Sequence, residues 1–144
     1  MKESVQAAVS YLRTRAEQLH IPSDFYKTRD IHVHFPEGAV PKDGPSAGIA
    51  VCTALASALS GTPVRRDIAM TGEISIRGRV LPIGGLKEKI LAAKMAHMKK
   101  VLVPDKNRPD IAELSKEITK GLTIVYVKTM EDVLKEAFAE AEPA

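Results

Sequence analysis

Residues 46–60, SAGIAVCTALASALS, form a run in which nearly every side chain is small or apolar. A helix over this run would have no polar face, so it must be buried on most of its sides. Gly61 follows the run directly and is a residue type that commonly ends helices. A chain of 144 residues is long enough to bury a sizeable core, so we expect one domain built around this helix.

Three further helices are predicted from the spacing of apolar residues. The segments concerned are residues 3–19, which Pro22 should end, residues 85–98 and residues 109–118. A last helix should begin at Thr129, because the sequence TMED resembles a capping box with Asp132 in the acidic position. Together with the buried run, these patterns predict helices along much of the chain.

The strands are predicted from alternating or continuous apolar patterns. The segments concerned are residues 30–35, 68–70, 100–104 and 122–127. Ile74 and Ile76 should also pair with Val80 in a hairpin that turns at Arg77 and Gly78. Strands mixed with helices, without an internal repeat or linker, indicate an α/β or α+β class with a mixed sheet and flanking helices.

Composition restricts the setting and the partners of the chain. The net charge is +3, and the basic residues are spread out without aromatic residues between them, so we expect solvated faces and no nucleic-acid partner. Cys52 is the only cysteine, which excludes a disulfide within the chain and fits a reducing cytoplasm. The longest apolar run, residues 47–59, is too short to cross a bilayer, so we expect a soluble cytoplasmic protein without a membrane partner.

Ser46 is the first candidate for chemistry, because it stands in the turn PKDGPSAGIAV directly before the buried helix. A serine at a helix start most often serves only as a cap that accepts a backbone N–H. The same backbone N–H groups are also suited to hold the oxyanion of an acyl-transfer intermediate. A catalytic role for Ser46 therefore depends on a base that can activate its hydroxyl.

The sequence offers histidines and lysines as candidate bases. The four histidines, His20, His32, His34 and His97, stand in no motif that ties them to Ser46, and two of them on one strand face do not complete a metal site. The helix at residues 85–98 carries Lys87, Lys89 and Lys94, and periodicity distinguishes only weakly which of them enters an apolar setting.

Two other kinds of site are not supported by the sequence. Cys52 lies within the apolar run without an adjacent base, so we interpret it as a small core residue. Neither G-x-x-x-x-G-K-[ST] nor G-x-G-x-x-G occurs, so neither of these routes to nucleotide binding is available. We therefore expect no metal, ATP or other cofactor in this domain.

Three long motifs carry a resemblance that covers almost the whole chain. PKDGPSAGIA, MTGEISIRG and VLPIGGLKEKILAAK stand in the order and spacing of the proteolytic domain of the bacterial ATP-dependent Lon protease family. The resemblance implies the compact fold of that family, with the nucleophile at Ser46 and the lysine base at Lys89. It further implies supporting roles for Thr71, which would hydrogen-bond the lysine, for Asp43, which would influence whether the site is open, and for Ala47.

The resemblance also implies an activity and an assembly. The family uses a Ser-Lys dyad to cleave unfolded, damaged or regulatory proteins, in a ring of six domains below AAA+ ATPase modules that bind ATP and magnesium. This single domain, residues 1–144, contains neither the ATPase part nor the substrate-binding part. The alternative is a non-catalytic, DNA-interacting scaffold similar to the Lon-type domain of the repair ATPase RadA, although a scaffold has no reason to keep both Ser46 and Lys89.

Overall fold

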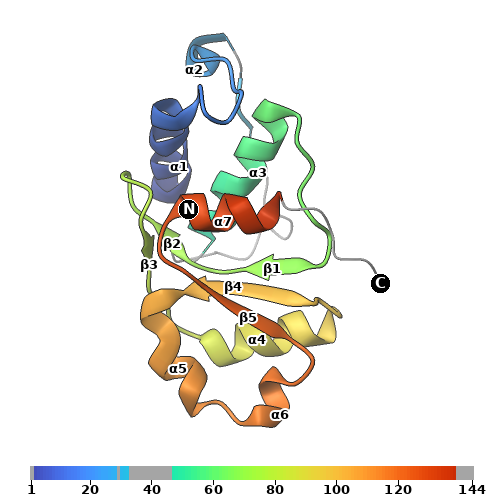
Figure 1. The fold of residues 1–144 in the computed structure, drawn as a ribbon. Coiled ribbons are helices and arrows are strands. Elements are labelled where there is room, and N and C mark those ends of the chain that lie inside the picture. Colours follow the sequence, from blue (N-terminus) through green and yellow to red (C-terminus); the bar gives the residue numbers. More distant parts are fainter. Residues whose placement is uncertain (1, 29, 33–46, 139–144) are drawn as a thin grey trace.

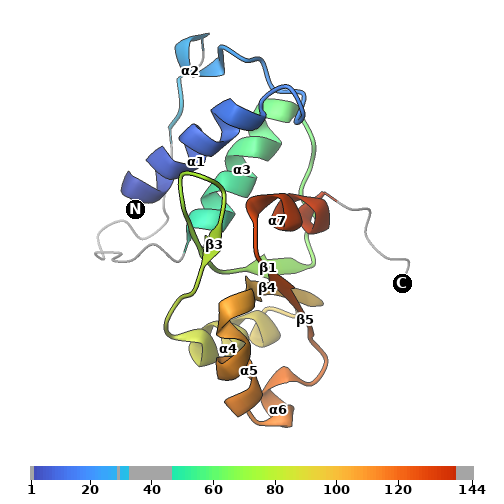
Figure 2. The same ribbon diagram turned by 60° about the vertical axis from the view of Figure 1, so that its left-hand side comes forward.

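A parallel sheet separates two groups of helices in the computed structural model, which describes residues 2–28, 30–32 and 47–138 (Figure 1). Figure 2 shows the sheet and the two groups of helices from a second direction. The helices on one side are α1 (Lys2–Arg15), α2 (Phe25–Thr28), α3 (Gly48–Ser60) and α7 (Met130–Ala137). Those on the other side are α4 (Leu86–Met95), α5 (Arg108–Glu113) and α6 (Lys116–Thr119). This arrangement confirms the expected α/β class.

The sheet is centred on β4 (Lys100–Pro104), which pairs in parallel with β1 (Ile68–Met70) and with β5 (Thr123–Val127). Val101 and Val103 belong to the core on the α4 side, whereas Leu102 belongs to the core on the α3 side. Successive side chains of a strand point to opposite faces, so β4 must be apolar at every one of these positions. Its continuous apolar pattern is the consequence of its central place.

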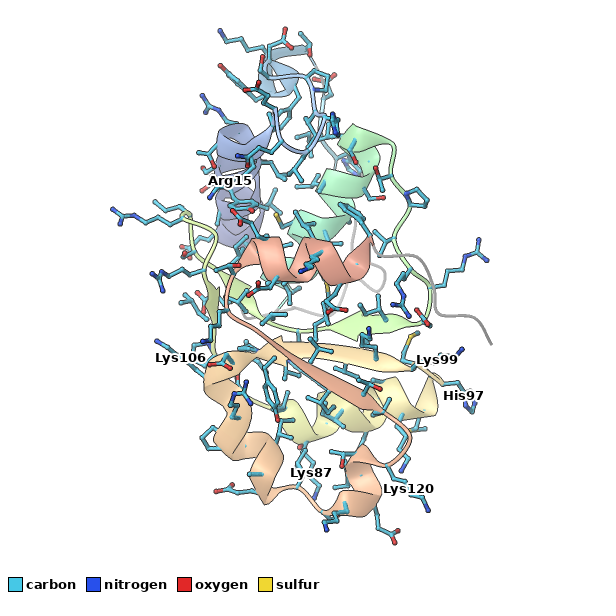
Figure 3. The ribbon with its side chains drawn as sticks, in the orientation of Figure 1. Arg15, Lys87, His97, Lys99, Lys106 and Lys120 are labelled. Carbon is cyan, nitrogen blue, oxygen red and sulfur yellow. The ribbon has the colours of Figure 1, made fainter. Side chains whose placement is uncertain are left out.

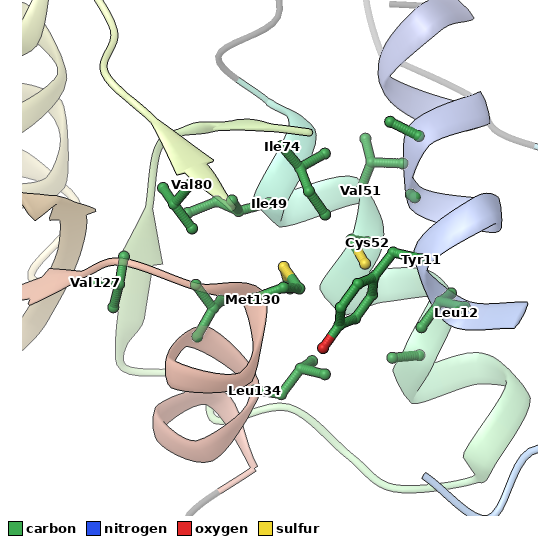
Figure 4. Close-up of a cluster of buried hydrophobic side chains, with 14 of the residues drawn as sticks. Tyr11, Leu12, Ile49, Val51, Cys52, Ile74, Val80, Val127, Met130 and Leu134 are labelled. Carbon is green, nitrogen blue, oxygen red and sulfur yellow. The ribbon is translucent and has the colours of Figure 1, made fainter. Parts of the chain in front are cut away.

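Helix α3 confirms the expectation drawn from the apolar run. Gly61 ends it in the left-handed conformation with a φ of 75°, and its N–H donates to the carbonyl of Ser57. The helix packs against α1 and α7, and Figure 4 shows Cys52 among the side chains of Tyr11, Met130 and Leu134. Helix α3 is therefore buried on most of its sides, and the exposed positions Ala54 and Ala58 carry only small side chains.

A short antiparallel hairpin lies between β1 and α4 in the chain. It consists of β2 (Glu73–Ile74) and β3 (Val80–Leu81), and Ile74 pairs with Val80 as predicted. Ile76 does not pair, because Gly78 closes a turn by donating its N–H to the carbonyl of Ser75, which leaves Ile76 66% exposed. The hairpin is also tied to the last part of the chain, since Val80 donates to the Lys128 carbonyl at 2.9 Å.

Two predicted helices differ from the observed ones. The first helix ends at Arg15, well before Pro22, because the chain turns there and Ile21 donates to the carbonyl of Ala16. The helix expected over residues 109–118 is divided into α5 and α6, because Leu114 and Ser115 adopt extended backbone angles. Both differences arise at turns, which the spacing of apolar residues does not predict.

The remaining local expectations have mixed outcomes. Residues 30–32 do not form a strand, and the rest of the expected strand at residues 33–35 lies outside the described residues. The capping box is confirmed, because the Thr129 hydroxyl accepts the Asp132 N–H and the Asp132 carboxylate accepts the Thr129 N–H. In the part of the chain that the structure describes, no helix combines the length and the apolar character needed to cross a membrane.

Candidate active site

A groove with a volume of about 420 Å³ lies where the start of α3, the end of β1 and one face of α4 meet. It is lined by Ala47, Ala50, Ala69, Met70, Thr71, Lys89, Ala92, Ala93, Ala96 and Met98. Six of these ten residues are alanines, whose short side chains leave room between the elements. The lining is therefore largely apolar, with Thr71 and Lys89 as its polar members.

Lys89 lies on α4 beside the buried residues Leu86, Ile90 and Ala93, and its own side chain is half-buried. Partial burial removes water from around the ammonium group, and this desolvation lowers the pKa of Lys89 below its ordinary value. Lys89 therefore loses its proton at a lower pH than a fully hydrated lysine does. A lysine in this environment is suited to accept a proton from a hydroxyl.

The structure separates Lys89 from the two other lysines that the sequence left open. Lys87 and Lys94 are exposed on α4, and neither lines this groove. Lys87 lies on the side of α4 that faces α5 and α6 in Figure 3, where it lines a separate cavity, and the Lys94 ammonium donates to the backbone carbonyl of Glu117. Among the described residues that line the groove, Lys89 is the one ionisable side chain.

Thr71 lines the groove directly after the end of β1. Its side chain is only 6% exposed. The Thr71 N–H donates to the carbonyl of Leu102 at 3.1 Å, which continues the pairing of β1 with β4. Thr71 is therefore fixed by the sheet itself.

Ala47 completes the described part of the site at the start of α3. The helix begins in close contact with the chain after β1, because a Cβ atom at Gly48 would lie 2.9 Å from the backbone nitrogen of Ile74. Ala47 occupies the N-cap position without a side-chain hydrogen bond. Ser46 and Asp43, which the sequence placed in this site, lie outside the described residues.

The other candidate bases and nucleophiles do not reach the groove. His20, His32 and His97 are exposed and do not line it, and His97 points into solvent at the edge of Figure 3. His34 lies outside the described residues. Burial raises the pKa of the Cys52 thiol to about 12, so this cysteine remains protonated and is a core residue, as expected.

Asn107 is a buried polar residue that the sequence patterns did not reveal. It is 2% exposed, and its side-chain amide makes two hydrogen bonds to the backbone of Ile83. An asparagine three residues after the end of an apolar strand looks like an ordinary turn residue. What distinguishes Asn107 from a turn residue is its contact with Ile83, which lies 24 residues earlier in the sequence.

Comparison with known proteins decides the family. Residues 1–140 match the family described as the Lon protease (S16) C-terminal proteolytic domain. The chain belongs to this family. It is 60% identical over 141 residues to a Lon protease of Erwinia amylovora, covering 98% of this chain and 18% of that protein. A Lon protease of Escherichia coli strain K12 is 60% identical over 134 residues, which are 93% of this chain and 17% of that protein.

Membership of the Lon family confirms the resemblance and identifies the chain as a protease domain. A third relative, the Lon protease of Lachnoclostridium phytofermentans, is 57% identical over 137 residues, which are 95% of this chain and 17% of that protein. The chain thus spans less than a fifth of the length of these relatives. The comparisons do not favour the RadA-type scaffold.

Proposed function

We propose that this Lon-family domain is a serine endopeptidase in which Ser46 is the nucleophile and Lys89 is the base. The observation that supports the pair most directly is the shared groove. Lys89 lines it, and so does Ala47, the residue covalently joined to Ser46. In the described lining no other ionisable group competes with Lys89 for the proton.

The reaction proceeds in two proton-balanced halves. Neutral Lys89 Nζ accepts the hydroxyl proton of Ser46 while Oγ attacks the carbonyl carbon of a peptide bond. The resulting ammonium returns this proton to the departing amine, and the acyl group stays on Ser46 as an ester. A water molecule then attacks the ester, gives one proton to Lys89 and releases the acid, after which Lys89 returns the proton to Ser46.

The start of α3 restricts which backbone groups stabilise the oxyanion. A helix N-terminus presents N–H groups without intrahelical partners, and these suit a developing negative charge. The Ile49 N–H is already engaged, because it donates to the carbonyl of Gly72 at 3.1 Å. We therefore assign the oxyanion to backbone amides that precede Ile49.

Thr71 and Asp43 complete the proposed site in supporting roles. The buried position of Thr71 directly after a strand, in the groove that Lys89 also lines, suits a hydroxyl that orients the Lys89 ammonium. Asp43 precedes Ser46 in the same motif, and we propose that it controls whether the serine segment is open to substrate.

The setting of the domain follows from the family as part of the same proposal. The substrates are unfolded polypeptides, the assembly is a homo-hexamer in the cytoplasm, and an AAA+ ATPase module delivers the substrate. ATP and magnesium belong to that module, because this chain has no phosphate-binding loop of the P-loop kind. Hydrolysis by the isolated domain should therefore be independent of both.

The deciding experiment is hydrolysis of an unstructured polypeptide by the wild type and by Ser46→Ala. We expect the substitution to lower the rate by at least about a thousand-fold, because the nucleophile is lost. Ser10→Ala, an exposed change on α1, is the matched control and should retain the wild-type rate. Activity that persists in Ser46→Ala would show that Ser46 is not the nucleophile.

A further inference from the structure

The segment before α4 has few local restrictions on its backbone conformation. Gly84 and Gly85 stand between Ile83 and the first helical residue, and glycine restricts the backbone least of all residues. Gly85 starts the helix in the left-handed conformation, with a φ of 67°. The orientation of the first turn of α4 must therefore be set by contacts from elsewhere in the fold.

Asn107 supplies such contacts to Ile83, the last residue before the two glycines. Its Oδ1 accepts the Ile83 N–H at 3.0 Å, and its Nδ2 donates to the Ile83 carbonyl at 2.9 Å. The second Nδ2 hydrogen donates to a carboxylate oxygen of Asp110 at 2.6 Å. Donors and acceptors match in one amide orientation only, so Asn107 holds both backbone groups of Ile83 at once.

The contact between Asn107 and Ile83 is held in place because Asn107 lies close to the end of the central strand β4. Asn107 ends a short 3-10 helix, Asp105–Asn107, that begins directly after this strand. Residues of this strand are buried on both faces of the sheet, as the two cores on either side of it show. Asn107 thereby ties the segment before α4 to a strand in which residues 101–104 are all buried.

Ile83 precedes Lys89 by six residues, and Lys89 stands in the first turn of α4. The Lys89 N–H donates to the carbonyl of Gly85 at 3.4 Å, which is the opening hydrogen bond of α4. A change in the direction of residues 83–85 therefore acts on Lys89 directly through the backbone. Building on the proposed role of Lys89 as the base, we infer that Asn107 is a positioning residue that aims Lys89 into the groove by fixing Ile83.

Helix α4 has apolar anchors of its own. Leu86, in its first turn, packs with Ile90, Ala93, Val101 and Val103 in the core on the α4 side of the sheet. The helix should therefore remain folded when Asn107 is replaced, while residues 83–85 before it lose the contact that fixes their direction. This separates a positioning role from a purely structural one, because catalysis should suffer more than stability.

Within the described lining of the groove no charged side chain accompanies Lys89, so a change of its environment should be visible in its titration. Helix α3 and strand β1 carry no charged side chain. The charged residues of α4 and of the helices packed against it are Lys87, Glu88, Lys94, Asp110, Glu113, Lys116, Glu117 and Arg108. Four of them, Lys87, Glu88, Asp110 and Glu113, line a separate cavity of about 520 Å³ that does not contain Lys89.

The test compares Asn107→Ala with two controls in peptide hydrolysis across a range of pH. Asp110→Ala removes one neighbour of Asn107 but leaves both bonds to Ile83 in place. Val133→Ala, in the core on the other side of the sheet, lowers stability without touching this region. The apparent pKa of Lys89 is also measured without catalysis, from the pH dependence of its acylation by an amine reagent, followed by mass spectrometry.

We expect Asn107→Ala to lower kcat by about 10- to 100-fold with KM changed less than about twofold, because a misplaced base slows only the chemical step. The pH midpoint of the rate and of Lys89 acylation should both move upward, toward the value of a hydrated lysine. Asp110→Ala and Val133→Ala should retain the wild-type kcat and midpoints. Should Asn107→Ala fail to fold, Asn107→Ser takes its place with the same expected direction.

Two outcomes would overturn the inference. The first is a folded Asn107 variant with wild-type kcat and pH profile, and the second is an equal loss of kcat in Val133→Ala at a matched fall in Tm. Absence of hydrolysis in the wild type would count against the proposed function instead. In that case the acylation measurement still decides about Asn107, because an unchanged Lys89 midpoint in Asn107→Ala would refute the positioning role.

Discussion

Ile49 donates its backbone N–H to the carbonyl of Gly72 at 3.1 Å, and this bond joins the first turn of α3 to the chain just after β1. Gly72 follows Thr71, and Ile49 follows Ala47 by two residues. Two sides of the groove are therefore held together by the backbone, independently of any side chain. Helix α4 brings Lys89 to the third side.

The first prediction concerns the base. Lys89→Ala and Lys89→Arg should both lower hydrolysis by at least about a hundred-fold, because alanine cannot take a proton and arginine remains charged. Lys87→Ala is the matched control on the same helix and should leave the rate of hydrolysis nearly unchanged. Rates are measured on an unstructured polypeptide, with circular dichroism to establish folding. Wild-type turnover in Lys89→Arg would exclude Lys89 as the base.

The pH dependence of the wild type follows from the lowered pKa of Lys89. Desolvation disfavours the ammonium form, so the neutral, active form becomes populated at a lower pH than in a free lysine. The rate should therefore rise with pH, and its midpoint should lie below the ordinary lysine pKa of about 10.4. A pH titration of kcat tests this, and a midpoint at or above that ordinary value would contradict the desolvated environment.

A prediction on packing concerns Gly48. A Cβ atom at this position would lie 2.9 Å from both the backbone nitrogen and a side-chain carbon of Ile74, and the backbone atom cannot rotate away. Gly48→Ala should therefore lower the free energy of unfolding by about 1–3 kcal/mol, as overpacking does. Gly84→Ala, where a Cβ meets nothing within 4 Å, is the control and should change it little. Urea denaturation measures the change in the free energy of unfolding for both variants. Equal changes in Gly48→Ala and Gly84→Ala would contradict the close contact at Gly48.

The capping box of α7 gives a prediction on stability alone. Thr129→Ala removes the hydroxyl that accepts the Asp132 N–H, and the loss should cost about 1 kcal/mol. Thr119→Ala removes only a long, exposed hydrogen bond of 3.4 Å from the hydroxyl to the Lys116 carbonyl, and it should stay within about 0.5 kcal/mol of the wild type. Thermal denaturation distinguishes the two, and an unchanged Tm in Thr129→Ala would show that the cap contributes nothing.

Cys52 should be inert in the folded protein. Burial keeps its thiol protonated, with a pKa of about 12, and the thiolate is the form that reacts. A thiol reagent at pH 8 should modify native protein very slowly and denatured protein at once. Rapid labelling of the native form, followed by absorbance, would mean that α3 opens frequently.

Local patterns predicted the elements that depend on neighbours in the sequence. The buried helix with Gly61 at its end, the strand at residues 100–104, the pairing of Ile74 with Val80 and the capping box at Thr129 are all confirmed. Each of them is encoded within a few residues, by periodicity or by a turn residue. The first helix was predicted too long because apolar spacing continues through the turn after Arg15.

Contacts between distant residues were less accessible to the sequence. Periodicity did not distinguish Lys89 from Lys87, because both stand next to apolar positions, and the packing of α4 on the sheet decides between them. Asn107 was missed because its partner Ile83 lies 24 residues earlier. The roles assigned to Lys89, Thr71 and Ala47 stay predictions, as do those of Ser46 and Asp43, which lie outside the described residues.

The bonds between the hairpin and the start of α7 bear on when the domain becomes complete during its synthesis. Val80 donates to the Lys128 carbonyl and Met130 donates to the Gly78 carbonyl, so the hairpin finds these partners only late in the chain. Contacts between distant residues form after the intervening chain exists and after the entropy cost of closing the loop is met. On the ribosome, the hairpin beside the groove would thus remain unsecured until β5 and the first turn of α7 had emerged. The groove that contains Lys89 would accordingly reach its final form only after translation had passed that point.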